Sequence, residues 1–242
     1  MKNLNNKPIL YAILTISAIL WFGIALVTRA DMGKLFDFFK ILPTVATFDL
    51  ILWLVFTKWA WKWKVFKGWL VPFPDLNGTW HGTVYSTWID PESGKAVEPI
   101  PAILTIRQTF GRISCVMRTI EMASYSVAED FHIDEDNQIR QLAYLYSSKP
   151  IHCVSERSAQ HNGAIVLDVI ETPNRKLKGE YWTQRKTTGH VEMEFRCKEL
   201  LEEVPEDLRK HPMQKSTNEK EEALPETIPP EGGSISKPME NL

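Results

Sequence analysis

The chain is poor in the residues that mark several protein classes. It has three Cys in 242 residues, Cys115, Cys153 and Cys197, which are spread out and form no CxxC pair. This excludes a disulfide-dense secreted scaffold and the usual zinc spacings, and it suits a reducing cytoplasm. The formal net charge of -2 argues against a generally basic protein that coats nucleic acid, so no nucleic-acid partner is expected. Because 44% of the residues are hydrophobic, a wholly disordered chain is also excluded.

Motifs of the common enzyme classes are missing as well. The sequence has no GxSxG, HExxH, P-loop or glycine-rich dinucleotide pattern. Its six His are dispersed, and the acidic run Asp134, Glu135, Asp136 is typical of a solvated turn. Cys115 and Cys197 fall in phase with apolar strand positions, which favours buried reduced thiols over metal ligands. We therefore expect no enzyme, no bound metal and no cofactor.

The small net charge is the sum of three different segments. Residues 1–70 carry nine Lys/Arg and three Asp (net +6), residues 71–198 carry fourteen Lys/Arg and sixteen Asp/Glu (net -2), and residues 199–242 carry five and eleven (net -6). We expect a two-helix transmembrane anchor, a cytoplasmic ligand-sensing domain and an acidic, largely disordered tail, in that order. The tail has no aromatic residue and six of the fifteen Pro, which leaves too little apolar surface to bury. Residues 200–209 favour a short helix within it.

Two apolar stretches predict a transmembrane hairpin. Residues 9–28 form an uncharged run of 20 residues, which at about 1.5 Å per residue spans the roughly 30 Å hydrocarbon core. A cleaved signal peptide is the alternative, but the run is long for one and no small-residue cleavage site follows. The second span, about 38–57, contains Asp49. A carboxylate there is costly, so Asp49 is expected to face protein, water or a partner, with a protonated or snorkelling carboxyl as the alternative.

Trp and Lys residues gather at the end of the second span. Five of the nine Trp lie between positions 53 and 69, and Trp59, Trp61 and Trp63 alternate with other residues beside Lys, as in a membrane-interface belt. Six Lys flank the outer ends of the two spans, namely Lys2, Lys7, Lys58, Lys62, Lys64 and Lys67. The connecting loop holds only Arg29, Lys34 and Lys40. The positive-inside rule therefore predicts a multi-pass protein with both termini in the cytoplasm.

The middle segment alternates between apolar and polar residues and predicts eight strands. They are Thr79–Trp88, Ile100–Thr109, Arg112–Glu121, Met122–Ile133, Gln138–Ser147, Gly163–Glu171, Lys176–Gln184 and His190–Cys197. Turn signals separate them, among them residues 161–163 and 188–189, and no long helical pattern interrupts. These features predict an eight-stranded up-and-down, lipocalin-like antiparallel barrel. A barrel of this size is filled by side chains or holds one small ligand, and a two-sheet sandwich is the alternative architecture.

Polar and aromatic residues in phase on these strands favour a ligand-binding interior. Tyr181, Thr183 and Arg185 share one face with Leu177 and Gly179. Two further faces are proposed to point inward, one made of Ser124, Ser126, Ala128 and Asp130, the other of Val166, Asp168 and Ile170. The candidate ligand-binding residues are Tyr181, Thr183, Arg185, Arg107, Arg118, Ser126 and Tyr146. Arg forks, hydroxyls and Tyr rings suit a planar anionic ligand; an outward-facing position is the alternative for each residue, and the stronger one for any single Arg.

Three stretches carry a family resemblance. They are DLNGTWHGTVYSTW (Asp75–Trp88), ILTIRQT (Ile103–Thr109) and LKGEYWTQRKTTGHVEMEF (Leu177–Phe195). Together with the two-helix anchor they resemble the two-transmembrane β-barrel effectors of bacterial CBASS anti-phage systems, over about residues 5–198. The resemblance implies that a partner nucleotidyltransferase makes a cyclic dinucleotide, which the barrel binds as its activating ligand. It further implies homo-oligomer formation on activation and disruption of the inner membrane, which kills the infected cell.

Two other function classes stay open from the residues alone. One is a membrane-tethered lipocalin-like protein that carries or senses a small hydrophobic ligand, which predicts an interior without Arg. The other is a structural module that binds another protein on the barrel exterior, which predicts a barrel packed shut.

Overall fold

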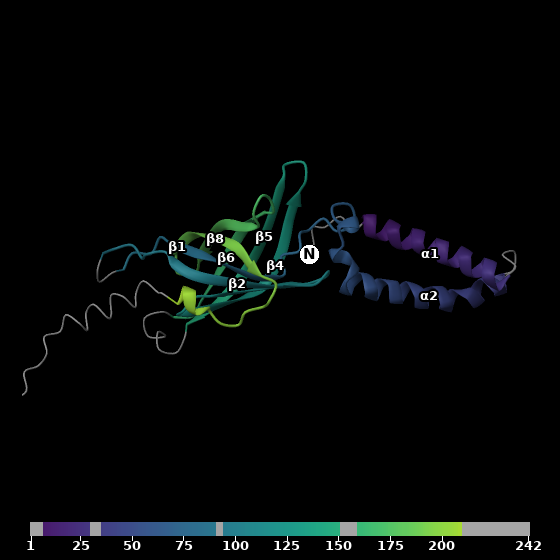
Figure 1. The fold of residues 1–242 in the computed structure, drawn as a ribbon, viewed down its shortest axis with the longest axis horizontal. Coiled ribbons are helices and arrows are strands. Elements are labelled where there is room, and N and C mark those ends of the chain that lie inside the picture. Colours follow the sequence, from purple (N-terminus) through teal and green to yellow (C-terminus); the bar gives the residue numbers. More distant parts are fainter. Residues whose placement is uncertain (1–6, 30–34, 91–93, 151–158, 210–242) are drawn as a thin grey trace, which may run out of the picture.

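The computed structural model describes residues 7–29, 35–90, 94–150 and 159–209. Helices α1 (Lys7–Thr28) and α2 (Leu35–Lys58) form an antiparallel hairpin that extends from one end of a β-barrel (Figure 1). Both helices are long and apolar enough to cross a membrane. They agree with the predicted spans to within a few residues. Two short 3-10 helices, η1 (Ala60–Lys62) and η2 (Lys64–Phe66), connect α2 to the barrel.

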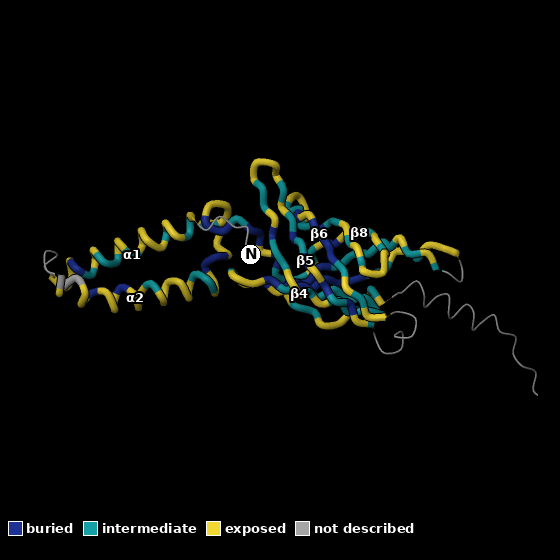
Figure 2. The backbone as a smooth tube through the Cα atoms, turned by 180° about the vertical axis from the view of Figure 1, so that it is seen from behind, coloured by how far each residue is buried: buried dark blue, intermediate teal, exposed yellow. Residues whose placement is uncertain are grey.

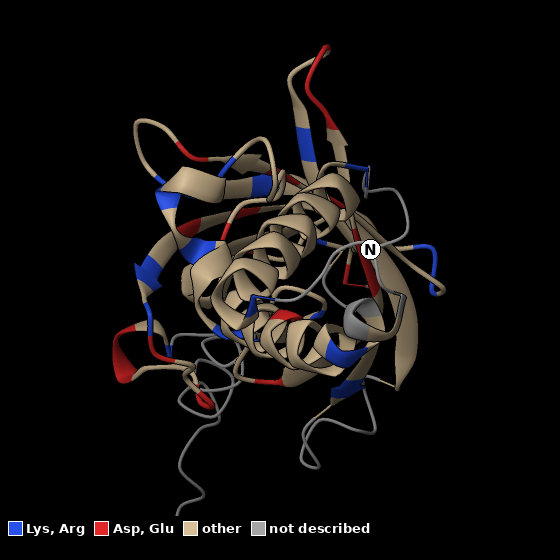
Figure 3. Cartoon of the chain, turned by 90° about the vertical axis from the view of Figure 1, so that its right-hand side faces the viewer, with Lys and Arg blue, Asp and Glu red and all other residues tan. Residues whose placement is uncertain are grey.

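The hairpin is held by one small apolar cluster and leaves most of its side chains exposed. Ala25 of α1 packs with Ile41 and Val45 of α2. The remaining helix surface is apolar and mostly exposed (Figure 2), and seen from the helix side it is almost free of charged residues, which gather on the barrel instead (Figure 3). An apolar exposed surface is what a lipid environment requires of a spanning helix.

Eight antiparallel strands follow and close into a barrel in which each strand pairs with its neighbours in sequence and β8 pairs with β1. The strands are β1 (Gly78–Ser86), β2 (Ile100–Gln108), β3 (Ile113–Arg118), β4 (Met122–Asp134), β5 (Ile139–Pro150), β6 (His161–Ile170), β7 (Lys176–Thr183) and β8 (Thr188–Cys197). The predicted up-and-down barrel is confirmed. Closure gives every strand a hydrogen-bonded neighbour on both sides, so the sheet has no edge strand.

The barrel interior holds the core. Trp80, Leu104, Phe131, Leu142 and Leu167 are each at most 1% exposed. They come from five different strands, so the alternation of inward and outward residues on each strand builds a single apolar centre.

Residues 198–209 continue past β8 and pack on the outer wall of the barrel. The hydroxyl of Thr79 donates a 2.6 Å hydrogen bond to the carbonyl of Glu199, and that of Thr105 donates to the carbonyl of Leu201 at 2.9 Å. Asp207, in the short 3-10 helix η4 (Glu206–Leu208), forms an ion pair with Arg196 at 3.0 Å. These hydrogen bonds and this ion pair attach the first eleven residues of the predicted tail to the barrel, and Val204 among them is buried. Residues 210–242 lie outside the described residues.

Candidate functional site

The interior of the barrel is apolar at the end next to the hairpin and polar at the opposite end, which we call the distal end. Phe73, Leu76 and Phe131 fill the first end and are buried. At the distal end the inward positions carry hydroxyl groups, namely those of Ser86 on β1, Ser124 and Ser126 on β4, Ser148 on β5 and Thr183 on β7. Ser124 Oγ donates to Ser148 Oγ at 2.9 Å. The polar lining therefore faces away from the membrane helices.

Two tyrosines project into this distal end, each against a glycine on the next strand. Tyr146 on β5 pairs with Gly163 on β6, and Tyr181 on β7 pairs with Gly189 on β8. A Cβ built on Gly163 would overlap the Tyr146 hydroxyl, and one on Gly189 would lie 2.6 Å from the Tyr181 ring. The absence of a side chain at both glycines is what lets the rings lie across the neighbouring strand.

Both tyrosines keep their protons at neutral pH. Burial raises the pKa of Tyr146, and the nearby Tyr181 raises it further. Burial also raises the pKa of Tyr181, while a hydrogen bond with Ser86 opposes the shift. Two neutral phenols thus stand near each other, each with an O–H donor and an aromatic face. Such groups suit a ligand with flat rings and acceptor oxygens.

The Ser126 hydroxyl makes two hydrogen bonds inside the barrel. Its hydroxyl accepts a 2.8 Å hydrogen bond from the backbone N–H of Cys115 and donates to the carboxylate of Glu129. The register of β4 shifts between Ser126 and Ala128, which places Val127 in a β-bulge. After the bulge Glu129 and Phe131 point inward and Ala128 and Asp130 outward. The predicted inward face of β4 is therefore right for Ser124 and Ser126 and wrong for Ala128 and Asp130.

The arginines lie outside the barrel interior. Arg107 is exposed between two buried inward residues of β2, and Arg118 pairs with the outward-facing Ile103 at the distal end of β3. Arg185 is exposed in the turn between β7 and β8, next to the distal end. For Arg107 and Arg118 the outward-facing alternative, given above as the stronger one for any single Arg, is the one observed, because strand alternation places their side chains on the outer face. None of the Lys or Arg side chains in the described ranges is buried.

Other predicted positions have mixed outcomes. On β6 the inward residues are Ile165 and Leu167, so the predicted inward face through Val166 and Asp168 is the outer face. Cys115 is a free, buried thiol as expected, and burial raises its pKa, whereas Cys197 is free but only partly buried. Cys153 lies outside the described residues. Among the residues that the structure describes, no group of three His, Cys, Asp or Glu side chains is arranged to hold a metal ion.

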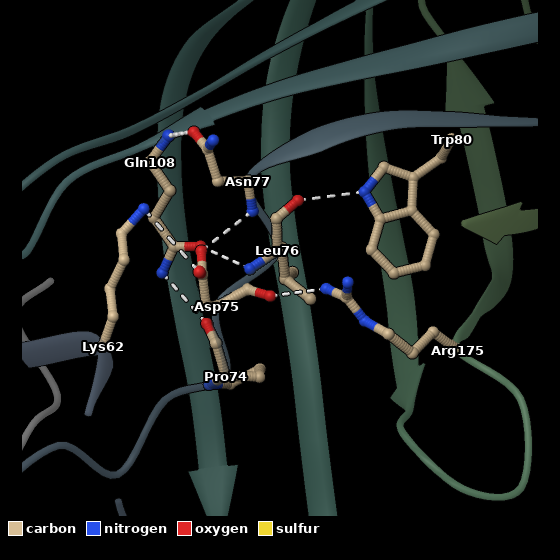
Figure 4. A network of polar contacts seen from close by, with 8 residues as sticks. All are labelled: Lys62, Pro74, Asp75, Leu76, Asn77, Trp80, Gln108 and Arg175. Atoms are coloured by element: carbon tan, nitrogen blue, oxygen red, sulfur yellow. Dashed lines mark hydrogen bonds and ion pairs between the residues drawn. The ribbon is translucent and has the colours of Figure 1, made fainter. Parts of the chain in front are cut away.

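We call residues 59–77, between α2 and β1, the linker, and the end of the barrel next to the hairpin its base. A polar network attaches the end of the linker to this base (Figure 4). The buried amide of Gln108 donates to the carbonyl of Pro74 at 3.0 Å and accepts from the N–H of Leu76 at 2.7 Å. The Trp80 indole N–H donates to the Leu76 carbonyl at 3.0 Å. The guanidinium of Arg175 donates to the Asp75 carbonyl at 2.6 Å and stacks over the Trp80 ring. The network holds the backbone of residues 74–76 in place, just before the chain enters β1 in the DLNGTW stretch.

Aromatic rings connect the same base to α2. Phe110, in the turn between β2 and β3, lies against Trp53 and Phe56 of α2 and against Phe73 of the linker, with centroids 5.0–5.9 Å apart. Phe73 in turn stacks on Phe131 inside the barrel at 5.7 Å. The rings make an unbroken path from the second helix into the barrel core.

The Trp belt divides between two environments. Trp61 is 3% exposed and packs against Phe73, so it belongs to the barrel base and not to an interfacial belt. Trp59 and Trp63 are exposed, as an interfacial position requires. Proximity to Lys did not distinguish the two cases, because the burial of Trp61 depends on Phe73 and Phe110 from elsewhere in the chain.

Comparisons with known proteins agree with this arrangement. A family model described as "Cap15, cyclic dinucleotide receptor domain" matches residues 71–195, more than half of the chain and nearly the whole barrel. The chain is also similar to a curated protein of Staphylococcus schleiferi named CD-NTase-associated protein 15. The two are 28% identical over 158 residues, which cover 65% of this chain and 78% of that protein.

Proposed function

This chain belongs to the Cap15 family of cyclic dinucleotide receptors, and we propose that it senses its ligand with the distal end of the barrel and acts on the membrane with its helices. It is a CBASS effector that binds a cyclic dinucleotide. In the proposal, ligand binding drives self-association of the membrane-anchored chains. The assembled helices then disrupt the inner membrane and kill the infected cell.

The placement of Tyr146 and Tyr181 supports the distal end as the ligand site. A cyclic dinucleotide has two flat bases and two phosphodiesters, so it needs stacking surfaces and hydrogen-bond donors. The paired phenols supply both, and the Ser and Thr hydroxyls around them supply further donors. Each base stacked on an aromatic ring typically contributes about 1–3 kcal/mol.

The two phosphates are proposed to meet cations at the distal rim, since the described interior has none. Arg185 lies two residues after Thr183, in the turn after β7, and Arg118 ends β3 at the same end of the barrel. A guanidinium forms a planar fork that matches a phosphate. Thr183 is an inward neighbour of these groups, although its hydroxyl also accepts a hydrogen bond from the Thr187 N–H at 3.2 Å.

The aromatic path at the barrel base supports transmission to the membrane. Phe110 contacts both the linker and α2, so a change in the barrel that moves the β2–β3 turn is passed to the helix end. Within the hairpin, Ser17 of α1 donates a 2.7 Å hydrogen bond to the Asp49 carboxylate of α2. We propose that this carboxylate lines a polar contact in the assembled state, because a charge at membrane depth favours water-lined surroundings.

The proposal is tested with the full chain in detergent micelles. Thermal shift and titration calorimetry are run against cyclic di-GMP, cyclic di-AMP and cyclic GMP–AMP, with a linear dinucleotide as the ligand control. We expect one cyclic dinucleotide to raise the melting temperature. Tyr181→Phe is expected to weaken its binding about tenfold, from the loss of one hydrogen bond to a charged group.

The matched variant is Tyr85→Phe, because Tyr85 faces outward and stacks on His190 at 4.3 Å. It should bind like the parent chain. Silence across the cyclic dinucleotides, with a response to a fatty acid, would replace the proposal with the lipocalin-like carrier.

A further inference from the structure

The outer wall of the barrel carries an apolar row across four neighbouring strands. Ala128 of β4 pairs with Leu145 of β5, Leu145 with Ala164 of β6, and Ala164 with Trp182 of β7. All four side chains point outward. Leu145 is 55% exposed and Trp182 is 48% exposed.

The β4 bulge adds to this row. Val127 is the extra residue of the bulge and is 71% exposed, the largest exposure among the large apolar side chains on the described barrel strands. We call Tyr125, Val127, Leu145, Ala164 and Trp182 the wall patch. An antiparallel barrel in water normally presents polar residues on its outer face, and contiguous exposed apolar patches mark interaction sites.

The wall patch places a small residue between two large ones. Ala164, which is only 8% exposed, lies between Leu145 and Trp182. A bulky side chain from a second copy would meet this small residue and no large one. A shallow groove beside Trp182 is lined mostly by polar and charged residues, among them Asp168, Lys178 and Glu180. A twofold axis that runs parallel to the strands, in the plane of contact and between β6 and β7, sets β6 of one copy against β7 of the other. It places Trp182 of each copy over Ala164 of the other.

Two charged residues on the hairpin side of the wall patch are related by the same twofold axis. Asp168 of β6 and Lys178 of β7 face outward as register partners, and both line the groove. The twofold operation that exchanges β6 and β7 sets Asp168 of one copy opposite Lys178 of the other. The two copies therefore meet with opposite charges at these two positions, in addition to the 3.0 Å ion pair that Lys178 forms with Glu192 within each copy.

The membrane anchor holds copies of the chain in the same bilayer and so brings their barrels together. The hairpin leaves the barrel from one end (Figure 1), so the wall faces sideways, toward other copies held in the same bilayer. The five residues of the wall patch are fewer than the roughly 20–30 residues per side of a standard stable interface. Tethering in one plane raises the effective concentration and lets a weak contact act.

We propose that the wall patch is the surface through which two copies of the barrel pair, with Trp182 of one copy against Ala164 of the other and Asp168 opposite Lys178. This inference rests on the self-association in the proposed function and names its surface. It differs from the proposed ligand site, which is on the inner face of the barrel.

A charge-exchange experiment tests it. Full chains with Cys153→Ser and Cys197→Ser, which leave only the buried Cys115, carry Glu180→Cys on the outer face of β7. They are placed in vesicles of phosphatidylethanolamine and phosphatidylglycerol and treated with a bismaleimide. Asp168→Lys or Lys178→Asp is added to this background. Each variant alone sets like charges against each other, so we expect cross-linked dimer to fall about tenfold or more.

Mixing the two variants restores opposite charges only between copies, because neither chain regains its own Asp168–Lys178 pair. The mixture is expected to recover the cross-linking of the parent. Equal cross-linking of each variant alone and of the mixture overturns the wall patch as the interface. So does equal cross-linking by a chain with Arg107→Cys in place of Glu180→Cys, because Arg107 lies on the outer face of β2, away from the patch.

The readout separates this inference from the proposed function. Cross-linking is followed with rising protein density in the absence of nucleotide, and again with each cyclic dinucleotide. Density-dependent dimers without any nucleotide response support the surface while contradicting the ligand. Nucleotide binding with no recovery in the mixture contradicts the surface alone. Thiol–amine cross-links from position 180 to lysines of residues 210–242 in the same copy also overturn it, since the patch is then covered internally.

Discussion

Tyr146 on β5 lies directly opposite Gly163 on β6, and its ring occupies the space that a side chain at position 163 would need. The same relationship links Tyr181 and Gly189 two strands further on. The position of the phenols therefore depends on residues that have no side chain. This makes the glycines a sensitive point at which to test the ligand site.

Gly163→Ala is expected to weaken both the barrel and ligand binding. The new Cβ would lie within 2.7 Å of the Trp182 carbonyl and would overlap the Tyr146 hydroxyl. Overpacking of this kind typically costs about 1–3 kcal/mol, and a displaced Tyr146 should lower nucleotide affinity by about tenfold. Thermal melting and calorimetry measure the two effects. Gly111→Ala is the control, because a Cβ there meets nothing within 4 Å. An unchanged affinity would remove Tyr146 from the site.

Gln108→Ala tests the attachment of the linker. The side-chain amide of Gln108, a residue that is 4% exposed, forms hydrogen bonds with the Pro74 carbonyl and the Leu76 N–H. Its removal leaves both of these buried backbone groups without their partner. We expect a loss of about 1–3 kcal/mol in the free energy of unfolding, with nucleotide affinity retained. Dye release from vesicles should fall more than binding does. Arg107→Ala, at the exposed neighbouring position, should change neither the stability nor the dye release. If Gln108→Ala lost nucleotide binding in parallel with dye release, the network would support the ligand site itself.

Asp49→Leu tests the polar contact within the hairpin. Loss of the carboxylate removes the hydrogen bond from Ser17, and we expect nucleotide-triggered dye release to disappear while barrel binding persists. Asp49→Asn keeps an acceptor for Ser17 and separates the hydrogen bond from the charge. Thr47→Val is the neighbouring control, since the Thr47 hydroxyl bonds only within its own helix, to the Pro43 carbonyl. Undiminished leakage from Asp49→Leu would exclude a role for this residue in the damage.

Alkaline pH is expected to destabilise the barrel. Burial raises the pKa of the Cys115 thiol and of the Tyr144 and Tyr146 phenols above their ordinary values of 9.0 and 10.0. These groups stay protonated in the folded state while the unfolded state loses their protons. Stability is therefore fully present below about pH 9 and falls as the pH rises further.

Melting temperature against pH, with phenolate absorbance recorded in parallel, measures this effect. Tyr144→Phe should flatten the alkaline decline relative to the parent. A melting temperature that stays constant through this range would contradict the burial of these groups.

Much of the fold could be predicted because its signals are local. Uncharged runs long enough for a bilayer indicated α1 and α2, and alternation with short turns indicated all eight strands. The direction each strand faces was harder. On β4 the bulge at Val127 reverses the alternation, and on β6 the apolar residues on both faces left the phase ambiguous.

The candidate site was predictable only in part. Tyr181 and Thr183 were placed correctly on the inner face with Leu177, and Tyr146 also lies there. Gly163 and Gly189 were read as turn residues, although glycine inside a strand pattern is itself a signal of close approach by a neighbour. Gln108 gave no signal, because its partners in the linker are more than 30 residues away.

The sequence by itself determined which segments are apolar throughout, which alternate, and how the charge divides among three parts. These properties belong to neighbours along the chain, and they suffice for a helical hairpin and a barrel. Only the tertiary structure decided that Trp61 is buried, that Arg107 faces outward, that residues 199–209 pack on the outer face of β1 and β2, and that two tyrosines share the distal end. Each of these depends on closure of the barrel, which brings distant strands together and gives every strand an inside.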